Sequence, residues 1–171
     1  RELPASAHTS ESDLGHGLVD MIVPRPELRD RLASLIDMLI HDLHVQAEKG
    51  PKKQPATHST VPAWDQVQLS RHRERPTASD FVELMTGSFF ELRGDRTGTD
   101  DPALIGGLAR IGDTNVVVIG QERGDLTLEG ARHDGRVSPA GYRKARRLML
   151  LAERLKLPLI TFVDTPGAHD G

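Results

Sequence analysis

The order of elements in residues 104–163 constrains the fold of this chain most strongly. Two apolar, β-like runs occupy residues 104–111 and 116–120, and the residues between them are few enough to form a hairpin. A helical pattern opens at Ser138-Pro139, and the apolar run 159–163 then predicts a buried strand. Two strands, a helix and a further strand in this order indicate an α/β layer structure.

Three details of this part bear on its packing. Gly106-Gly107 interrupts an apolar run, and glycine inside a strand indicates a bulge or a point of crowding more than a ligand contact. Residues 121–137 are charged and contain glycine, so we expect a surface loop. The helix that follows is expected to bury one apolar face, formed by Tyr142, Ala145, Leu148, Met149, Ala152 and Leu155.

The first part of the chain predicts a strand and a long helix. Residues 18–23 are mostly apolar and are closed by Pro24, which is typical of a short strand. From Pro26 the apolar residues recur every three or four positions, which predicts an amphipathic helix of about five turns. These apolar residues are Leu28, Leu32, Leu35, Ile36, Leu39, Ile40 and Leu43.

Residues 48–62 are expected to form an extended linker. They contain three prolines and three lysines but no periodic apolar residue. Beyond them, residues 63–69 predict a short helix. A second helix is expected from Thr77, where Thr77 or Ser79 can cap its first turn. Residues 86–102 are turn-rich.

Composition excludes several classes of function. The formal net charge of −3 over 171 residues is too small to indicate a nucleic acid or an anionic membrane as the main partner. The chain has no cysteine, which removes disulfides, thiolate nucleophiles and cysteine-ligated zinc. No apolar run reaches the roughly 18–20 residues that span a bilayer. Residues 1–4 show no signal-peptide pattern, so we expect a cytoplasmic protein.

The ends of the sequence suggest a piece of a longer polypeptide. The chain begins at Arg1 and not at Met, and it stops at Gly171, directly after a strand and its loop. A strand of an α/β domain normally needs a following helix to cover it.

Metal sites are weakly indicated. His41 and His44 lie about one helical turn apart with Asp37 nearby, but zinc needs three or four converging ligands. A structural or surface role is therefore favoured for these histidines, and zinc is not expected in this segment. Residues 95–101 are acidic, yet their glycine spacing differs from that of a calcium loop and the terminal glutamate is missing.

A resemblance to a known family rests on several segments. The run 138–149, SPAGYRKARRLM, closely resembles the alpha subunit of the acetyl-CoA carboxylase carboxyltransferase. The resemblance extends in order over nearly all of residues 63–171. Its other segments are 64–72, 91–96, 100–109, 152–154 and 158–168.

Residues 17–23 and 29–35 are similar to the C-terminal end of the beta subunit of the same enzyme. The arrangement resembles forms in which both subunits are fused into one polypeptide. It implies three parts: 1–47 as the end of a beta-like domain, 48–62 as a linker, and 63–171 as the first part of an alpha-like domain. The implied fold is crotonase-like, an incomplete set of stacked β-β-α units.

The resemblance implies a transferase that moves a carboxyl group from a carboxybiotinyl carrier protein to acetyl-CoA, giving malonyl-CoA for fatty acid synthesis. It implies biotin carried on a partner protein, with no cofactor bound covalently. Biotin carboxylase, the biotin carboxyl carrier protein and other copies of the full chain are the implied partners. Two alternatives stay open: a non-catalytic assembly or regulatory module, and a carboxyltransferase for another acyl-CoA such as propionyl-CoA.

The loop after residues 159–163 is the candidate site. The resemblance implies that backbone groups of Gly167 and Ala168, with Gly171, shape the biotin side, because N–H groups can stabilise a developing oxyanion without reorganisation. A plain chain-reversing turn at Pro166-Gly167 is the alternative. A further glycine-rich oxyanion segment and the acyl-CoA site are expected outside this sequence.

A basic cluster early in the helix from Ser138 offers a second interpretation. Arg143, Lys144, Arg146 and Arg147 can attract CoA phosphates or an acidic carrier domain. A solvated helix face is the simpler reading, and we favour it.

Overall fold

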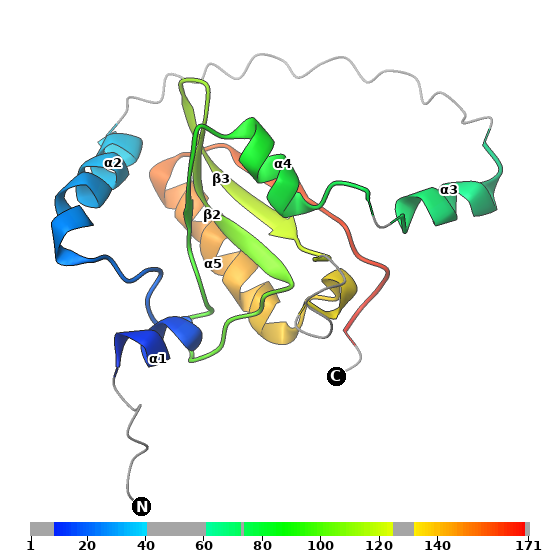
Figure 1. Ribbon diagram of the computed structural model, residues 1–171, viewed down its shortest axis with the longest axis horizontal. Coiled ribbons are helices and arrows are strands. Elements are labelled where there is room, and N and C mark those ends of the chain that lie inside the picture. Colours follow the sequence, from blue (N-terminus) through cyan, green and yellow to red (C-terminus); the bar gives the residue numbers. More distant parts are fainter. Residues whose placement is uncertain (1–8, 41–60, 73, 125–131, 170–171) are drawn as a thin grey trace, which may run out of the picture.

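A four-stranded sheet forms the centre of the molecule. The computed structural model describes residues 9–40, 61–72, 74–124 and 132–169 (Figure 1). The strands are β1 (Ser88–Glu91), β2 (Leu104–Ile111), β3 (Thr114–Gln121) and β4 (Leu159–Phe162), in the spatial order β1-β2-β3-β4. The first three run antiparallel in sequence, and β4 pairs with β3 in parallel. This is the mixed α/β structure that the element order predicts.

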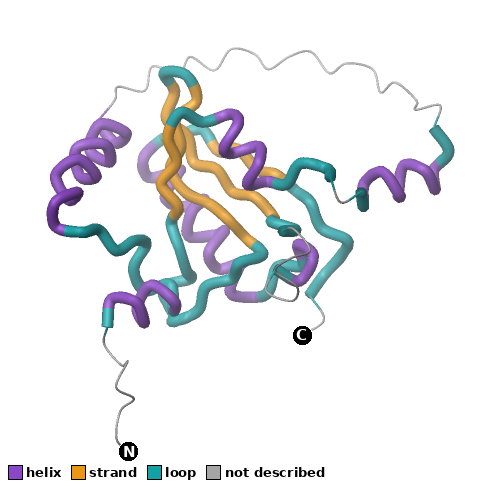
Figure 2. Tube along the Cα trace, viewed as in Figure 1, coloured by secondary structure: helices purple, strands orange, loops and turns teal. Residues whose placement is uncertain are grey.

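Helices lie on both faces of the sheet (Figure 2). The long helix α5 (Pro139–Leu155) packs against β2 and β3 on one face, and the short helix α4 (Ala78–Met85) covers part of the other. The remaining helices are α1 (Ser10–Gly15), η1 (Arg25–Glu27), α2 (Leu28–Ile40), α3 (Ala63–Ser70) and η3 (His133–Gly135). No helix in the described ranges combines the length and apolar character needed to cross a bilayer.

Two apolar clusters hold the layers together. The larger one lies between the sheet and α5, where Leu104, Leu108 and Val117 of the strands meet Leu148 and Ala152 of the helix. The smaller one lies under α4, where Val82 contacts Ala109, Val116 and Val118. Burial of such side chains contributes about 1.5–3 kcal/mol each, so these clusters fix the position of both helices on the sheet.

Local sequence signals predict several elements correctly. The hairpin between β2 and β3, the helices at 63–70 and 78–85, and the helix beginning at Pro139 are all confirmed. Thr77 is the N-cap of α4: its side chain accepts from the Asp80 N–H, and the Asp80 carboxylate accepts from the Thr77 N–H, which is a capping box.

Gly106-Gly107 is a point of crowding and not a bulge. The residue pairing of β2 with β3 continues without interruption through both glycines. A Cβ atom on Gly107 would lie 1.9 Å from the carbonyl oxygen of Phe90 on β1, and one on Gly106 would lie 2.4 Å from a methyl carbon of Leu148. Glycine at these positions lets the neighbouring strand and α5 approach the backbone of β2.

Two predictions about strands are wrong. Residues 18–23 form no strand: Asp20 accepts from the Arg93 N–H through its side chain, and among the described residues no strand pairs with this segment. Conversely, the turn-rich stretch 86–102 contains β1, which pairs residue by residue with β2. A strand forms only where a neighbouring strand is available for pairing, and a segment of four residues is too short for its alternating pattern to predict that pairing.

Burial also differs from the predictions in the second half of the chain. Strand β4 was predicted to be buried, but it is an edge strand and Leu159 is exposed. Alternate side chains such as Phe162 pack beneath α4. The ring of Phe162 stacks on that of Phe81, with 5.6 Å between the ring centroids. Tyr142 and Met149 point away from the core, since α5 buries Lys144 in their place. Residues 121–137 are not simply a surface loop, because Glu122 and Val137 are buried at its two ends.

The predicted N-terminal helix is confirmed as α2, a 13-residue helix that ends the described range at Ile40. Its last predicted turn, with His41, His44 and residues 41–47, lies outside the described residues, as does most of the expected linker 48–62. Asp37, which was considered with those histidines, forms an ion pair with Arg110 at 2.7 Å.

Candidate functional site

The carboxyl ends of the two parallel strands β3 and β4 meet at one edge of the sheet. Ligands of α/β sheets bind preferentially outside the carboxyl ends of such strands. Here residues 122–124 follow β3 and residues 163–169 follow β4. The side-chain oxygen of Gln121 accepts from the Asp164 N–H at 3.0 Å, which joins the two connections. This edge is therefore the candidate site, and it contains the loop that the sequence indicates.

Two arginines attach the segment between α3 and α4 to this edge. The Arg75 guanidinium forms an ion pair with the Asp164 carboxylate. Arg123 donates to the carbonyl oxygen of Arg75 at 3.0 Å and to that of Ser70 at 3.3 Å. Asp164, the second residue of the loop after β4, is thus anchored by Arg75 from the segment that precedes α4.

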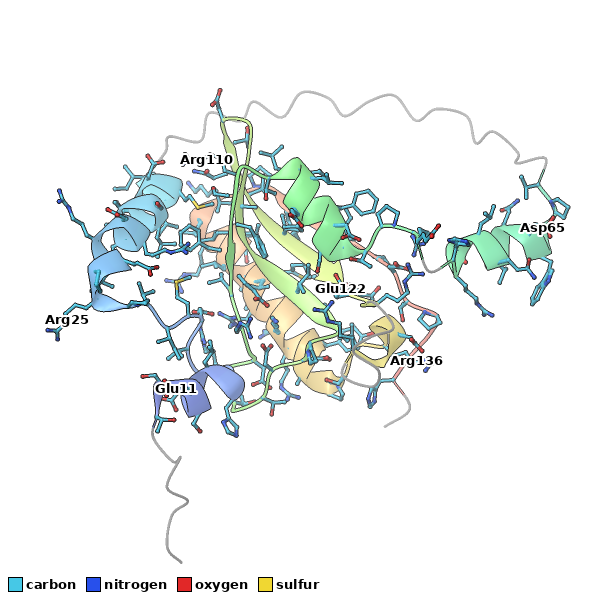
Figure 3. The ribbon with its side chains drawn as sticks, in the orientation of Figure 1. Glu11, Arg25, Asp65, Arg110, Glu122 and Arg136 are labelled. Atoms are coloured by element: carbon cyan, nitrogen blue, oxygen red, sulfur yellow. The ribbon has the colours of Figure 1, made fainter. Side chains whose placement is uncertain are left out.

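Glu122 is the most deeply buried charged group at this edge, with no solvent-exposed surface (Figure 3). One carboxylate oxygen accepts from the backbone N–H and the hydroxyl of Ser79 in the first turn of α4. The other accepts from the Gly124 N–H at 2.8 Å and faces the Arg132 guanidinium at 3.4 Å. A carboxylate at a helix N-terminus is stabilised by the free N–H groups there. Glu122 therefore fixes α4 relative to the connection that leaves β3.

The predicted site residues Gly167 and Ala168 lie together in the exposed loop after β4. The Thr165 hydroxyl donates to the carbonyl oxygen of Gly167 at 2.7 Å and accepts from the Gly167 N–H at 3.2 Å. None of the described residues accepts a hydrogen bond from the Ala168 N–H. Gly171, the third predicted residue, lies outside the described residues.

The hydrogen bonds within the loop determine which backbone N–H group can donate to a ligand. Thr165 occupies the Gly167 N–H, so the Ala168 N–H is the donor that remains free to face a negatively charged oxygen. A Cβ atom on Gly167 would meet nothing within 4 Å, which leaves room for a ligand beside the loop. The loop therefore offers a backbone donor at Ala168.

The basic cluster at the start of α5 contains one buried cation, Lys144, beside partly and fully exposed arginines. Lys144 is 1% exposed, and its ammonium donates to Asp100 Oδ1 at 2.9 Å and to the Leu104 carbonyl at 2.8 Å. Arg143 donates to Asp95, and Arg147 donates to the Arg93 carbonyl at 2.8 Å. The preferred interpretation of a solvated face is wrong for Lys144, which is buried beside Asp100 of the acidic loop 95–101. It holds for Arg143, which is exposed although it pairs with Asp95. Arg146 is exposed, as expected.

The same contacts explain the acidic loop. Asp101 is buried, and its carboxylate accepts from the Ala103 N–H and from both the N–H and the hydroxyl of Ser138, next to the first turn of α5. Its charge complements the positive end of that helix. In the described part of the chain, no three His, Asp or Glu side chains gather in a way that could hold a metal ion.

Asp95 has a strongly displaced acidity. Burial raises the pKa of its carboxyl group, but hydrogen bonds from Thr97, Arg143 and Thr99 together outweigh burial and hold the pKa well below its ordinary value. The pKa of Asp100 is also lowered, because Lys144 and the N–H groups of Gly94 and Asp101 outweigh the effect of burial. Both groups stay ionised in the folded chain at neutral pH.

We expect Asp95→Asn to weaken the dependence of stability on acid. Because the folded pKa lies below the unfolded value of about 3.9, the stabilisation by Asp95 is complete above that pH and is lost as pH falls toward the folded pKa. At pH values between the folded pKa and about 3.9, unfolding of the variant should take up roughly one proton fewer than unfolding of the wild type. Urea titrations at several pH values measure this slope. Identical slopes for both proteins would contradict the assignment.

Sequence reasoning missed Glu122, Asp101 and the burial of Lys144. A signal was present, because an acidic loop at 95–101 and a basic cluster at 143–147 carry complementary charges. Helical periodicity places these residues on a helix but does not reveal which distant segment faces them.

Comparison with known proteins assigns the chain to a family. The family model described as acetyl co-enzyme A carboxylase carboxyltransferase-like matches residues 10–171. The "Acetyl-coenzyme A carboxylase carboxyl transferase subunits beta/alpha" of Salinispora arenicola is 44% identical over 181 residues, covering 100% of this chain and 32% of that protein. The "Acetyl-coenzyme A carboxylase carboxyl transferase subunit alpha" of Francisella tularensis is 44% identical, covering 85% of this chain and 48% of its own.

Among solved structures, the beta subunit of P. aeruginosa geranyl-CoA carboxylase matches 84% of this chain and 23% of its own, with a TM-score of 0.44 and 17% identity. The chain spans 32% of the length of the Salinispora relative. On the family match over residues 10–171, this chain belongs to the acetyl co-enzyme A carboxylase carboxyltransferase-like family.

Proposed function

We propose that this chain is part of the carboxyltransferase component of acetyl-CoA carboxylase, which transfers a carboxyl group from a carboxybiotinyl carrier protein to acetyl-CoA and yields malonyl-CoA. The observation that carries the proposal is the family match over residues 10–171. The 44% identity to a fused beta/alpha protein over the whole chain supports it further. The proposal includes a crotonase-like fold and the division into 1–47, 48–62 and 63–171.

The contribution of this chain is to shape the biotin side of the site with backbone groups. Biotin, carried on the partner protein, supplies the carboxyl group. The loop after β4 fits that role, because its Ala168 N–H is unpartnered among the described residues and the space beside Gly167 is open. The Ala168 N–H would donate to a negatively charged oxygen, and Thr165 holds the turn in place through Gly167.

The loop is held by groups that take no part in the chemistry. The ion pair between Arg75 and Asp164 and the hydrogen bond from the Asp164 N–H to Gln121 fix the start of the loop. Such support matters because a donor must remain in place while charge develops. The acetyl-CoA pocket and a second oxyanion segment are proposed to lie in other parts of the whole protein.

The implied partners are a biotin carboxyl carrier protein, biotin carboxylase and further copies of the full chain, acting in the cytoplasm. Propionyl-CoA is the alternative substrate, because the acyl pocket is proposed to lie outside this chain. A non-catalytic module is the alternative for the whole chain; it would bind a biotinylated carrier without turning it over.

In the complete enzyme, Gly167→Val should lower kcat by about 10²- to 10³-fold, the usual effect of losing one oxyanion donor. A Cβ atom at Gly167 meets no atom of the described residues within 4 Å, so the fold should tolerate the substitution. Its methyl groups instead occupy the space beside the Ala168 N–H. Steady-state assay of carboxyl transfer with the carboxylated carrier protein measures the effect.

Gly87→Val is the matched control, because Gly87 is also exposed with open space around it but lies at the far end of α4. It should leave kcat unchanged. Unchanged turnover in Gly167→Val would remove this loop from the site while leaving the family assignment intact.

A further inference from the structure

The outward face of α5 carries a groove outside the candidate site. Helix α5 buries its other face against β2 and β3, and Figure 1 shows it behind the sheet, on the side away from α4. The groove has a volume of about 620 Å³ and runs along the helix beside Asp95. Its helical residues recur at intervals of three and four, which places them on one stripe of the helix. They are Arg143, Arg146, Arg147, Leu150, Leu151 and Arg154.

Positive charge is concentrated in this groove. Four guanidinium groups line it against two carboxylates, those of Asp95 and Glu153, on a chain whose formal net charge is −3. The Asp95 carboxylate is already paired with Arg143. Arg146 and Arg154 are exposed, and neither forms an ion pair with a residue that the structure describes. The groove therefore has cations that remain available to a negatively charged ligand.

Two of the arginines are held in position by the fold. Asp95 Oδ2 accepts from Nε and Nη2 of Arg143 at 2.9 and 2.6 Å, while much of the Arg143 side chain remains exposed. Arg147 donates to the carbonyl oxygen of Arg93 at 2.8 Å. Burial and the positive charge of Arg96 lower the pKa of Arg147, although three aspartates oppose this effect. Cations that are fixed close together favour an anion beside them, and little ordering of these side chains opposes its binding.

The spacing of the charges selects the class of ligand. From Arg143 to Arg154 the helix rises by about 16 Å, at about 1.5 Å per residue. A single phosphate group cannot span that length, and two leucines interrupt the row of cations. Glu153 would repel a continuous phosphate backbone at one end of the groove. The groove thus fits a protein surface that presents acidic side chains on both sides of an apolar one.

The groove begins near the candidate site. Gly135, just before α5, packs against the loop after β4, since a Cβ atom on it would lie 2.5 Å from the Asp164 carbonyl oxygen. Helix α5 begins at Pro139, and Arg143 follows about one helical turn later. A protein bound along the groove therefore reaches the edge of the sheet that holds the candidate site.

We propose that this groove is the docking surface for the biotinylated domain of the carrier protein, which binds it through acidic side chains and so brings biotin to the loop after β4. The inference rests on the proposed function, because the carboxybiotinyl carrier protein is the donor in that reaction. Arg146 and Arg154 contact the carrier protein and take no part in the transfer itself.

The test reverses the charge of Arg146 and Arg154 in the complete enzyme. Arg146→Glu combined with Arg154→Glu should raise KM for the carboxylated carrier protein by about 10- to 100-fold and change kcat by less than about threefold, because like charges weaken docking and not the chemical step. The reverse reaction, in which malonyl-CoA carboxylates free biotin, needs no carrier protein. Its rate should equal that of the wild type, whereas a general loss of structure would lower both rates.

Two further variants complete the comparison. Arg146→Lys combined with Arg154→Lys keeps both charges and should leave KM close to that of the wild type. Arg29→Glu combined with Arg31→Glu makes the same change of charge on exposed positions of α2, outside the groove, and should leave KM unchanged.

An unchanged KM in the charge-reversed variant would overturn the docking surface, while transfer by the wild type would still support the proposed function. A slower reaction with free biotin in that variant would also overturn it, because the arginines would then act on more than docking. Binding of a single-stranded oligonucleotide that requires both arginines, with KM unchanged, would assign the groove to nucleic acid. Absence of transfer by the wild type would contradict the proposed function and this inference with it.

Discussion

Lys144→Met should lower the free energy of unfolding of this chain by about 3–5 kcal/mol, the usual result of removing one partner of a buried ion pair. Lys144 is 1% exposed, and its ammonium contacts the partly buried Asp100 carboxylate and the carbonyl oxygen of the buried Leu104. Methionine keeps the length of the side chain but leaves the Asp100 carboxylate without its cation and the Leu104 carbonyl without a donor. The penalty is electrostatic and not one of volume.

Arg146→Met, on the exposed side of the same helix, serves as the control and should change stability by less than about 0.5 kcal/mol. Urea denaturation of both variants gives the comparison, provided that the slope of the transition is unchanged. A loss of less than about 1 kcal/mol in Lys144→Met would mean that Asp100 finds solvent or another cation, and would contradict the burial described for this pair.

Glu122→Leu should lower the free energy of unfolding by about 3 kcal/mol or more, because buried N–H groups lose their acceptor at about 1–3 kcal/mol each. The N–H groups of Ser79 and Gly124 belong to the backbone and remain when the side chain changes. The added apolar contact does not replace their hydrogen bonds.

Glu122→Gln is the graded comparison. Its amide keeps one acceptor oxygen for Ser79 but turns an NH₂ group toward the Gly124 N–H, so the expected loss is about 1–2 kcal/mol. Thermal or urea unfolding ranks the three proteins. If the Glu122→Leu variant proved as stable as the wild type, the Glu122 carboxylate would not be the group that holds α4 to the end of β3.

The elements that sequence predicts here are those whose determinants are local. The capping box of Thr77 and Asp80 and the Pro139 start of α5 each act within a few residues. Strand β1 was not predicted, because its formation depends on pairing of residues 88–91 with residues 107–110 of β2. Residues 18–23 show the opposite failure, since a strand-like pattern without a partner edge forms no strand.

The residues of the candidate site also divide into those that the sequence indicated and those that it did not. Gly167 and Ala168 were indicated by a resemblance of the surrounding motif, and the structure places them at the carboxyl edge of parallel strands. Glu122 was missed because its partner Ser79 lies 43 residues away in the chain. Lys144 meets Asp100 across 44 residues. A charged residue is buried only when a partner for its charge is present, and the local sequence pattern does not reveal a partner that lies far along the chain.

The proposed carboxyl transfer is tested by the rate of malonyl-CoA formation from acetyl-CoA and carboxylated carrier protein, measured with the polypeptide produced from its native gene. We expect turnover that depends on the carrier protein and is slower with propionyl-CoA than with acetyl-CoA. A folded polypeptide that binds the carrier but forms no malonyl-CoA would contradict the proposed function and leave this chain as a non-catalytic module.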